Sequence, residues 1–256
     1  MRTRPGPLAL LVGALFAACL AACGANSDGP LRVDAAASLR EVTSELARLH
    51  AERTGKPLPR VNLAGSGELA RQVRAARKTD VFLSAGAQEL DGLEADGLVV
   101  PGTRRALCSN SLVVVALEPR PDFDLAQLVR ADHVAVAHTE LVPAGRYAAA
   151  WLRRIGLLNA LEGKLSRAAN VRAALAAVQS GACEYGIVYA SDLSAAPELR
   201  VVHRVPSSEL PAIEYAGVVL VDAPDVEEAR AFLEFCTSDE GRAIFERHGL
   251  LPAHVD

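Results

Sequence analysis

One local pattern occurs twice near the start of the chain: an apolar strand, a few small residues, a serine and an amphipathic helix. In the first copy, Leu31–Val33 is followed by Ala35–Ala37 and by Ser38, which we expect to be the helix N-cap. In the second copy, Arg60–Leu63 leads into Ser66. One copy is explained equally well by an ordinary capped helix. Two copies favour an anion site, because free N–H groups and the helix dipole face a ligand at such ends.

The rest of the chain continues the alternation of strands and helices. Short apolar runs rich in Val indicate buried strands, and they are separated by helical patterns. Asn170 has the position of an N-cap for the helix that begins at Val171. The sequence therefore predicts an α/β protein with parallel or mixed sheets and helices on both faces. The clearest strands are 80–84, 111–117, 133–137 and 185–189.

Composition limits the possible partners. The chain has 256 residues, 50% of them hydrophobic and 23% charged, which is typical of a globular protein. Its formal net charge is −4, which argues against general affinity for nucleic acid. An anion must therefore be held by local dipoles, against the net charge.

The N-terminus resembles a secretory leader. Arg2 and Arg4 precede an apolar run, Leu8–Leu20, that is too short to span a membrane. The following Leu-Ala-Ala-Cys resembles a bacterial lipobox, which implies cleavage before Cys23 and diacylation of its thiol. A plain secretory signal is the alternative. We expect a periplasmic or cell-surface lipoprotein attached to the membrane surface through Cys23.

The remaining cysteines and the histidines do not form a metal motif. Cys108, Cys183 and Cys236 show no CxxC spacing, and the six histidines are scattered without an i,i+4 pair. We interpret the three cysteines as small buried apolar residues. No cofactor and no metal site are expected.

Several stretches, in order, resemble the periplasmic molybdate-binding proteins of bacterial molybdate ABC transporters. The similarity covers about residues 31–252. The stretches are AAASL at 35–39, GSGELARQ at 65–72, DVFLSA at 80–85, NSLVVVA at 110–116, VPAGRYA at 142–148, NVRAAL at 170–175 and GIVYASD at 186–192.

The resemblance implies a two-lobed periplasmic binding protein fold of type II, the Venus flytrap, that closes on an anion between its lobes. It also implies a monomer that delivers molybdate or tungstate to a membrane permease. The predicted divisions are a lipoprotein signal peptide at 1–22, an anchor and spacer at 23–30, lobe one at 31–109 plus 217–256, and lobe two at 110–216.

The oxyanion ligands carried over from the family are neutral donors. Hydroxyl and amide groups are expected from two serines, backbone N–H groups from two helix starts, and a phenol from one tyrosine. They are Ser38, Ser66, Ala144, Val171 and Tyr189. A carboxylate beside an anion is unfavourable, so we expect Asp34 to point away from the pocket. Arg146 is interpreted as a solvent-facing residue of a first helical turn.

Other functions stay open at this point. The chain could bind another oxyanion, such as sulfate or phosphate, and the sequence does not separate molybdate from tungstate. A lipid-anchored hydrolase with Ser66 as nucleophile is a further alternative. Such a nucleophile needs a base and a group that orients it, and no Ser/His/Asp motif is visible. We therefore expect a binding protein rather than an enzyme.

Overall fold

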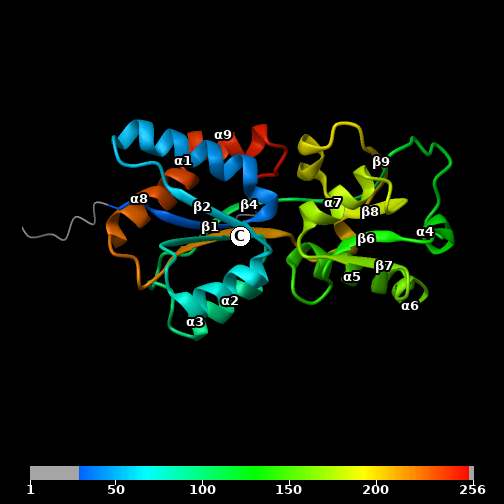
Figure 1. The fold of residues 1–256 in the computed structure, drawn as a ribbon, viewed down its shortest axis with the longest axis horizontal. Coiled ribbons are helices and arrows are strands. Elements are labelled where there is room, and N and C mark those ends of the chain that lie inside the picture. The colour runs from blue at the N-terminus through cyan, green and yellow to red at the C-terminus, as the bar shows by residue number, and fades with distance from the viewer. Residues whose placement is uncertain (1–28, 254–256) are drawn as a thin grey trace, which may run out of the picture.

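The computed structural model describes residues 29–253, which form two lobes side by side along the long axis of the molecule (Figure 1). The predictions about residues 1–22 and Cys23 lie outside this range. Between residues 29 and 253, no helix combines the length and the apolar character needed to cross a membrane. Each lobe is built around its own five-stranded sheet.

The sheet of the first lobe has the order β2-β1-β3-β10-β4. The central β1 pairs parallel with β2 and β3, whereas β10 runs antiparallel to β3 and β4. Helices α1, α8 and α9 cover one face and α2 and α3 cover the other (Figure 1). The bounds are β1 Arg32–Ala36, α1 Arg40–Thr54, β2 Arg60–Ala64, α2 Ser66–Ala76, β3 Val81–Ser84, α3 Ala87–Ala95, β4 Arg105–Ser109, β10 Glu214–Val219, α8 Val226–Thr237 and α9 Asp239–Arg247.

The sheet of the second lobe has the order β7-β6-β8-β5-β9. Strands β7, β6 and β8 are parallel, and β5 is antiparallel to both β8 and β9. Helices α5 and α7 pack on this sheet. The bounds are β5 Leu112–Ala116, α4 Ala126–Arg130, β6 Val134–Ala137, α5 Pro143–Arg154, α6 Leu158–Leu161, β7 Leu165–Ala168, α7 Val171–Gln179, β8 Tyr185–Tyr189 and β9 Arg200–Arg204. The expected α/β class, with two mixed sheets and helices on both faces, is confirmed.

The chain passes between the sheets twice. It leaves the first sheet after β4 and enters the second at β5, and it returns between β9 and β10. The crossings touch, because the hydroxyl of Ser109 donates to the carbonyl oxygen of Ile213 at 2.7 Å. We expect the lobes to divide near Ser109 and Ala216. The strand order does not show which residues move together as one lobe, so these boundaries remain predictions.

Ser38 does not cap α1, so that prediction is wrong. β1 continues to Ala36, a 3-10 turn follows at Ala37–Leu39, and α1 begins at Arg40 without a side-chain cap. The backbone N–H of Arg40 donates to the carbonyl of Ala37, so the turn itself provides a partner at this end. Asn170 is confirmed as the N-cap of α7, because its Oδ1 accepts the N–H of Ala173 at 3.0 Å.

Candidate anion site between the lobes

A small cavity lies between the lobes, at the ends of strands and the starts of helices. Its free volume is about 10 Å³, the room of roughly one water molecule. All five residues predicted as ligands line this cavity. The full lining is Ala36, Ala37, Ser38, Gly65, Ser66, Ala85, Val142, Pro143, Ala144, Asn170, Val171 and Tyr189.

Helix starts from both lobes converge on the cavity. Ser66 is the first residue of α2, Val171 is the first of α7, and Ala144 follows Pro143 at the start of α5. The first N–H groups of a helix have no partner inside that helix, and they carry the positive end of its dipole. Three such ends give the cavity an anion-attracting character without a formal charge.

The two serine hydroxyls are buried at the cavity wall. Ser66 Oγ accepts the backbone N–H of Ala85 at 3.1 Å. Ser38 Oγ lies 3.1 Å from Tyr215 Oη, although Tyr215 itself is not part of the lining. Sequence reasoning missed Tyr215, because nothing around its position near the start of β10 signals a role at the cavity.

Tyr189 contributes an unpartnered phenol. It is the last residue of β8 and is 1% exposed, and within residues 29–253 its Oη has no hydrogen-bond partner. Burial raises the pKa of Tyr189 well above its usual value, so the phenol keeps its proton. A buried hydroxyl without a partner is costly, and a ligand oxygen in the cavity would remove that cost.

Charged side chains surround the cavity but do not line it. Asp34 points away, as expected: its carboxylate accepts bonds from Asn62 at 3.1 Å and from Thr79 at 2.6 Å. Burial raises the pKa of Asp34 above its usual value, and these two bonds oppose that shift. Among the described lining residues there is no carboxylate, imidazole or cationic side chain.

Arg146 does not simply face solvent, so that interpretation is wrong. Its Nη2 donates to both carboxylate oxygens of Glu89, at 2.6 and 2.8 Å. Glu89 belongs to α3 in the first lobe and Arg146 to α5 in the second, so the pair joins the lobes. The sequence could not show this, because the partners are 57 residues apart and meet only when the lobes close.

A second ion pair joins the lobes on α7. Arg172 Nη2 donates to Glu41 of α1 at 2.6 Å, and Arg172 Nε lies 2.7 Å from Asp192 Oδ1. Asp192 is fully buried, and desolvation raises its pKa to about 7 against the opposing effect of Arg172. Arg172 therefore compensates a carboxylate from each lobe.

The lobes fit tightly around the cavity at glycines of the first lobe. A Cβ on Gly67 would lie 2.1 Å from the carbonyl oxygen of Leu141, and one on Gly65 would lie 3.0 Å from that of Ala169. A Cβ on Gly86 would meet the ring of Pro143 at 3.0 Å. At this separation of the lobes, side chains at these three positions would clash with the second lobe.

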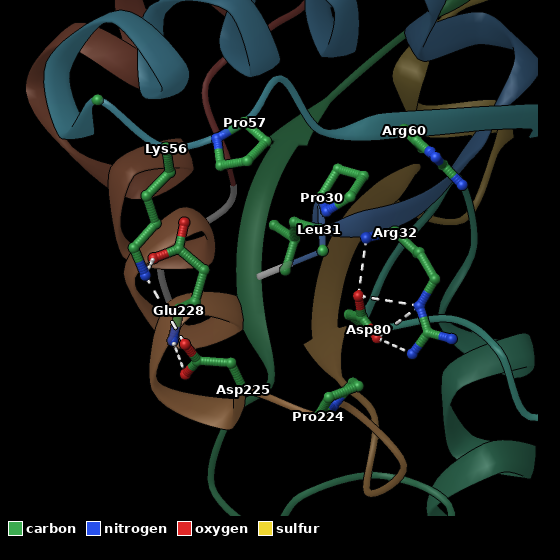
Figure 2. A pocket seen from close by; sticks show the side chains of 12 residues that line it. Pro30, Leu31, Arg32, Lys56, Pro57, Arg60, Asp80, Pro224, Asp225 and Glu228 are labelled. Carbon is green, nitrogen blue, oxygen red and sulfur yellow. Dashed lines mark hydrogen bonds and ion pairs between the residues drawn. The ribbon is translucent and has the colours of Figure 1, made fainter. Parts of the chain in front are cut away.

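A larger pocket of about 450 Å³ lies elsewhere on the first lobe, beside the N-terminal ends of β1 and β2 (Figure 2). Arg60 lines this pocket too, and Figure 2 shows its other charged groups in pairs: Arg32 with Asp80, and Lys56 with Asp225 and Glu228. Because these ions already have partners, the pocket presents no converging set of donors. We place the candidate site in the smaller cavity for this reason.

The described residues around Ser66 contain no catalytic partner for it. Its hydroxyl bonds to a backbone N–H, and no histidine or carboxylate lines the cavity. Across residues 29–253 there is no group of three His, Cys, Asp or Glu that could hold a metal ion. Cys108, Cys183 and Cys236 are free and buried, which confirms their interpretation as packed apolar residues.

The two-lobed fold with a cleft of neutral donors defines a class of ligand-binding protein. The chain belongs to the bacterial extracellular solute-binding protein family, whose sequence model matches residues 31–251.

Several relatives are described as molybdate-binding proteins. The molybdate-binding protein ModA of Escherichia coli strain K12 is 32% identical over 250 residues, which covers 94% of this chain and 96% of the relative. The ModA of Mycobacterium tuberculosis strain H37Rv is also 32% identical, over 93% of this chain and 95% of the relative. The solved periplasmic molybdate-binding protein of Azotobacter vinelandii shares the fold, with a TM-score of 0.79 and 21% identity over 88% of this chain and 100% of that one.

Proposed function

We propose that this protein binds molybdate or tungstate between its lobes and delivers the anion to an ABC transporter permease. The observation that carries the proposal is the convergence of Ser38, Ser66, Ala144, Val171 and Tyr189 on one cavity, with the Tyr189 phenol unpartnered among the described residues. The similarity to molybdate-binding proteins, at 32% identity over most of the chain, supports the choice of anion.

The chemistry of the donors suits a reversible binder of a dianion. A buried dianion needs a hydrogen bond at every oxygen, and hydroxyl and backbone N–H groups from two lobes supply donors from several directions. The donor side chains of the site are neutral, so release does not require the separation of a direct ion pair. We infer that the protein is a carrier without enzymatic activity or cofactor.

The site also predicts selectivity among oxyanions. Its ligands are donors, so an oxyanion that keeps a proton finds no carboxylate to accept it. Phosphate is still partly protonated at neutral pH, whereas molybdate, tungstate and sulfate are not. Sulfate is smaller than molybdate, so we expect it to contact fewer donors at once.

Calorimetric titration with molybdate, tungstate, sulfate and phosphate tests the function. We expect molybdate and tungstate to bind with similar affinity, sulfate to bind more weakly and phosphate to bind weakest. Equal or tighter binding of phosphate, or no binding of molybdate, would reject the proposed function.

We further propose that the protein is a monomeric lipoprotein attached to the membrane through Cys23. The support is the lipobox-like Leu-Ala-Ala-Cys and the apolar run before it. Mass spectrometry of the native protein tests the anchor, because the mature chain should begin at a diacylated Cys23. A mature chain that begins elsewhere would reject it.

A further inference from the structure

A buried hydrogen-bonded cluster lies at the two chain crossings, next to the cavity. Tyr215 near the start of β10 is fully buried, and its Oη lies 3.1 Å from Ser38 Oγ and 3.2 Å from Asn110 Nδ2. Asn110 follows β4 in the other crossing. Neither Tyr215 nor Asn110 lines the cavity, but Tyr215 contacts two residues that do: Ser38 through its hydroxyl and Tyr189 through its ring.

The orientation of the Asn110 amide is fixed by its neighbours. The backbone N–H of Ser111 donates to Asn110 Oδ1 at 2.9 Å, which assigns the oxygen to that side. The Nδ2 group therefore faces the cluster, where it donates to Ser191 Oγ at 2.8 Å and to Tyr215 Oη. An amide nitrogen only donates, so Tyr215 Oη accepts this bond.

The proton of Tyr215 is best placed towards Ser38. Asn110 Nδ2 and Ser38 Oγ lie 3.2 and 3.1 Å from Tyr215 Oη, and of these two only Ser38 can accept a proton, while the neighbouring Tyr189 phenol also interacts with Tyr215. The phenol therefore donates to Ser38 Oγ. Burial raises the pKa of Tyr215 well above its usual value, so the phenol keeps this proton. Ser38 accepts the bond, and its own proton stays free to turn towards the cavity.

Ser66 is arranged in the same way, but its donor is a peptide N–H, which cannot act as an acceptor. Its Oγ accepts the backbone N–H of Ala85 at 3.1 Å, so its proton is also free for the cavity. Each serine oxygen thus accepts a hydrogen bond from a protein donor, which leaves the serine proton free for the cavity. The difference is that Ser66 relies on a peptide N–H, whereas Ser38 relies on a hydroxyl that needs Asn110 to set its direction.

We propose that Tyr215 is a positioning residue for anion binding: it donates its phenol proton to Ser38 and so directs the Ser38 proton to the bound oxyanion, with Asn110 fixing this direction. The inference rests on the proposed function, because it concerns the same cavity. Tyr215 does not contact the anion. Without it, the Ser38 hydroxyl would lose the bond that orients it and would rotate among several directions.

A mutant cycle on the full chain tests the proposal, with molybdate as the titrant. Tyr215→Phe keeps the ring and removes the hydroxyl, and we expect it to weaken binding by about fivefold, within the range of one hydrogen bond. In a Ser38→Ala background the same change should have less than about a twofold effect, because no hydroxyl is left to orient. In a Ser66→Ala background, the matched control, the full fivefold loss should return.

The possible results separate this proposal from the proposed function. Failure of the wild-type protein to bind molybdate rejects the proposed function. The titrations of Tyr215→Phe in the three backgrounds test the role of Tyr215 alone. An equal loss in the Ser38→Ala and Ser66→Ala backgrounds indicates a general structural role and overturns the proposal. An unchanged affinity of Tyr215→Phe in the wild-type background overturns it too.

A neutron diffraction structure of the wild-type complex decides the proton positions even if Tyr215→Phe fails to fold. The expected result is a deuterium on Tyr215 Oη directed to Ser38 Oγ, and the Ser38 deuterium directed to the anion. The reverse arrangement, with Ser38 donating to Tyr215, would overturn the proposal.

Discussion

Replacement of Glu89 by glutamine should weaken anion binding without touching the cavity. The Glu89 carboxylate on α3 accepts both of its bonds from Arg146 on α5, and the two helices belong to different lobes. This ion pair can form only when the lobes close. Glu89→Gln removes the charge and leaves Arg146 without its partner, which raises the free energy of the closed state.

The free-energy cost of losing this ion pair follows from the exposure of the two side chains. The Glu89 side chain is 6% exposed and that of Arg146 is 25% exposed, so the pair lies between a buried and a surface ion pair. Breaking a buried pair costs about 3–5 kcal/mol, whereas exposed pairs contribute about 0–1 kcal/mol. We expect about 1–2 kcal/mol, which lowers the apparent affinity by about 5- to 30-fold if the free protein is mainly open.

Isothermal titration calorimetry with molybdate measures this effect. Glu89→Gln, Arg146→Gln and the double variant form a double-mutant cycle. The double variant should bind molybdate no more weakly than the single variant with the lower affinity. Arg167→Gln is the matched control, because Arg167 pairs with Glu162 inside the second lobe. If Glu89→Gln binds within about twofold of the wild-type protein, the ion pair does not stabilise closure and the reasoning fails.

Three other predictions concern the donors, the hinge and pH. Ser66→Ala removes a bond to a charged oxygen, worth roughly 1.5–3 kcal/mol, so calorimetry should show molybdate affinity reduced by about 10- to 150-fold; an unchanged affinity contradicts a ligand role. Small-angle scattering should show a smaller radius of gyration with saturating molybdate, because the donors lie on both lobes; an unchanged radius contradicts closure. Since burial raises the pKa of Asp192 to about 7, its deprotonation costs more in the folded than in the unfolded protein. This deprotonation therefore lowers the free energy of unfolding as pH rises from about 4 to 7. In chemical denaturation, the free energy of unfolding of Asp192→Asn should fall less than that of the wild-type protein over this pH range.

Local sequence predicted the parts of the site that depend on one strand and one helix. Ser66 and Val171 begin helices as expected, and Asn170 caps one of them, because these signals lie within a few residues of the helix start. The short edge strand β7 was missed, because its polar Ser166 and Arg167 give it no apolar alternation.

The contacts that depend on distant residues could not be predicted in this way. The partners Arg146 and Glu89 meet across the lobes, and Tyr215 reaches Ser38 from 177 positions away. Ser38 lines the cavity, but its predicted local role was wrong, since it lies in a 3-10 turn rather than at an N-cap. Whether a hydroxyl caps its own helix or bonds a distant phenol is decided by packing, not by the local pattern.

The position of the bound anion decides whether the neutral donors between the lobes form the binding site. A crystal structure with tungstate would reveal the metal by its anomalous scattering. We predict one tungsten peak between the lobes, with the tungstate oxygens within hydrogen-bond distance of the hydroxyls of Ser38, Ser66 and Tyr189 and of the first N–H groups of α5 and α7. A peak outside the cleft, or one held by arginine side chains, would contradict it.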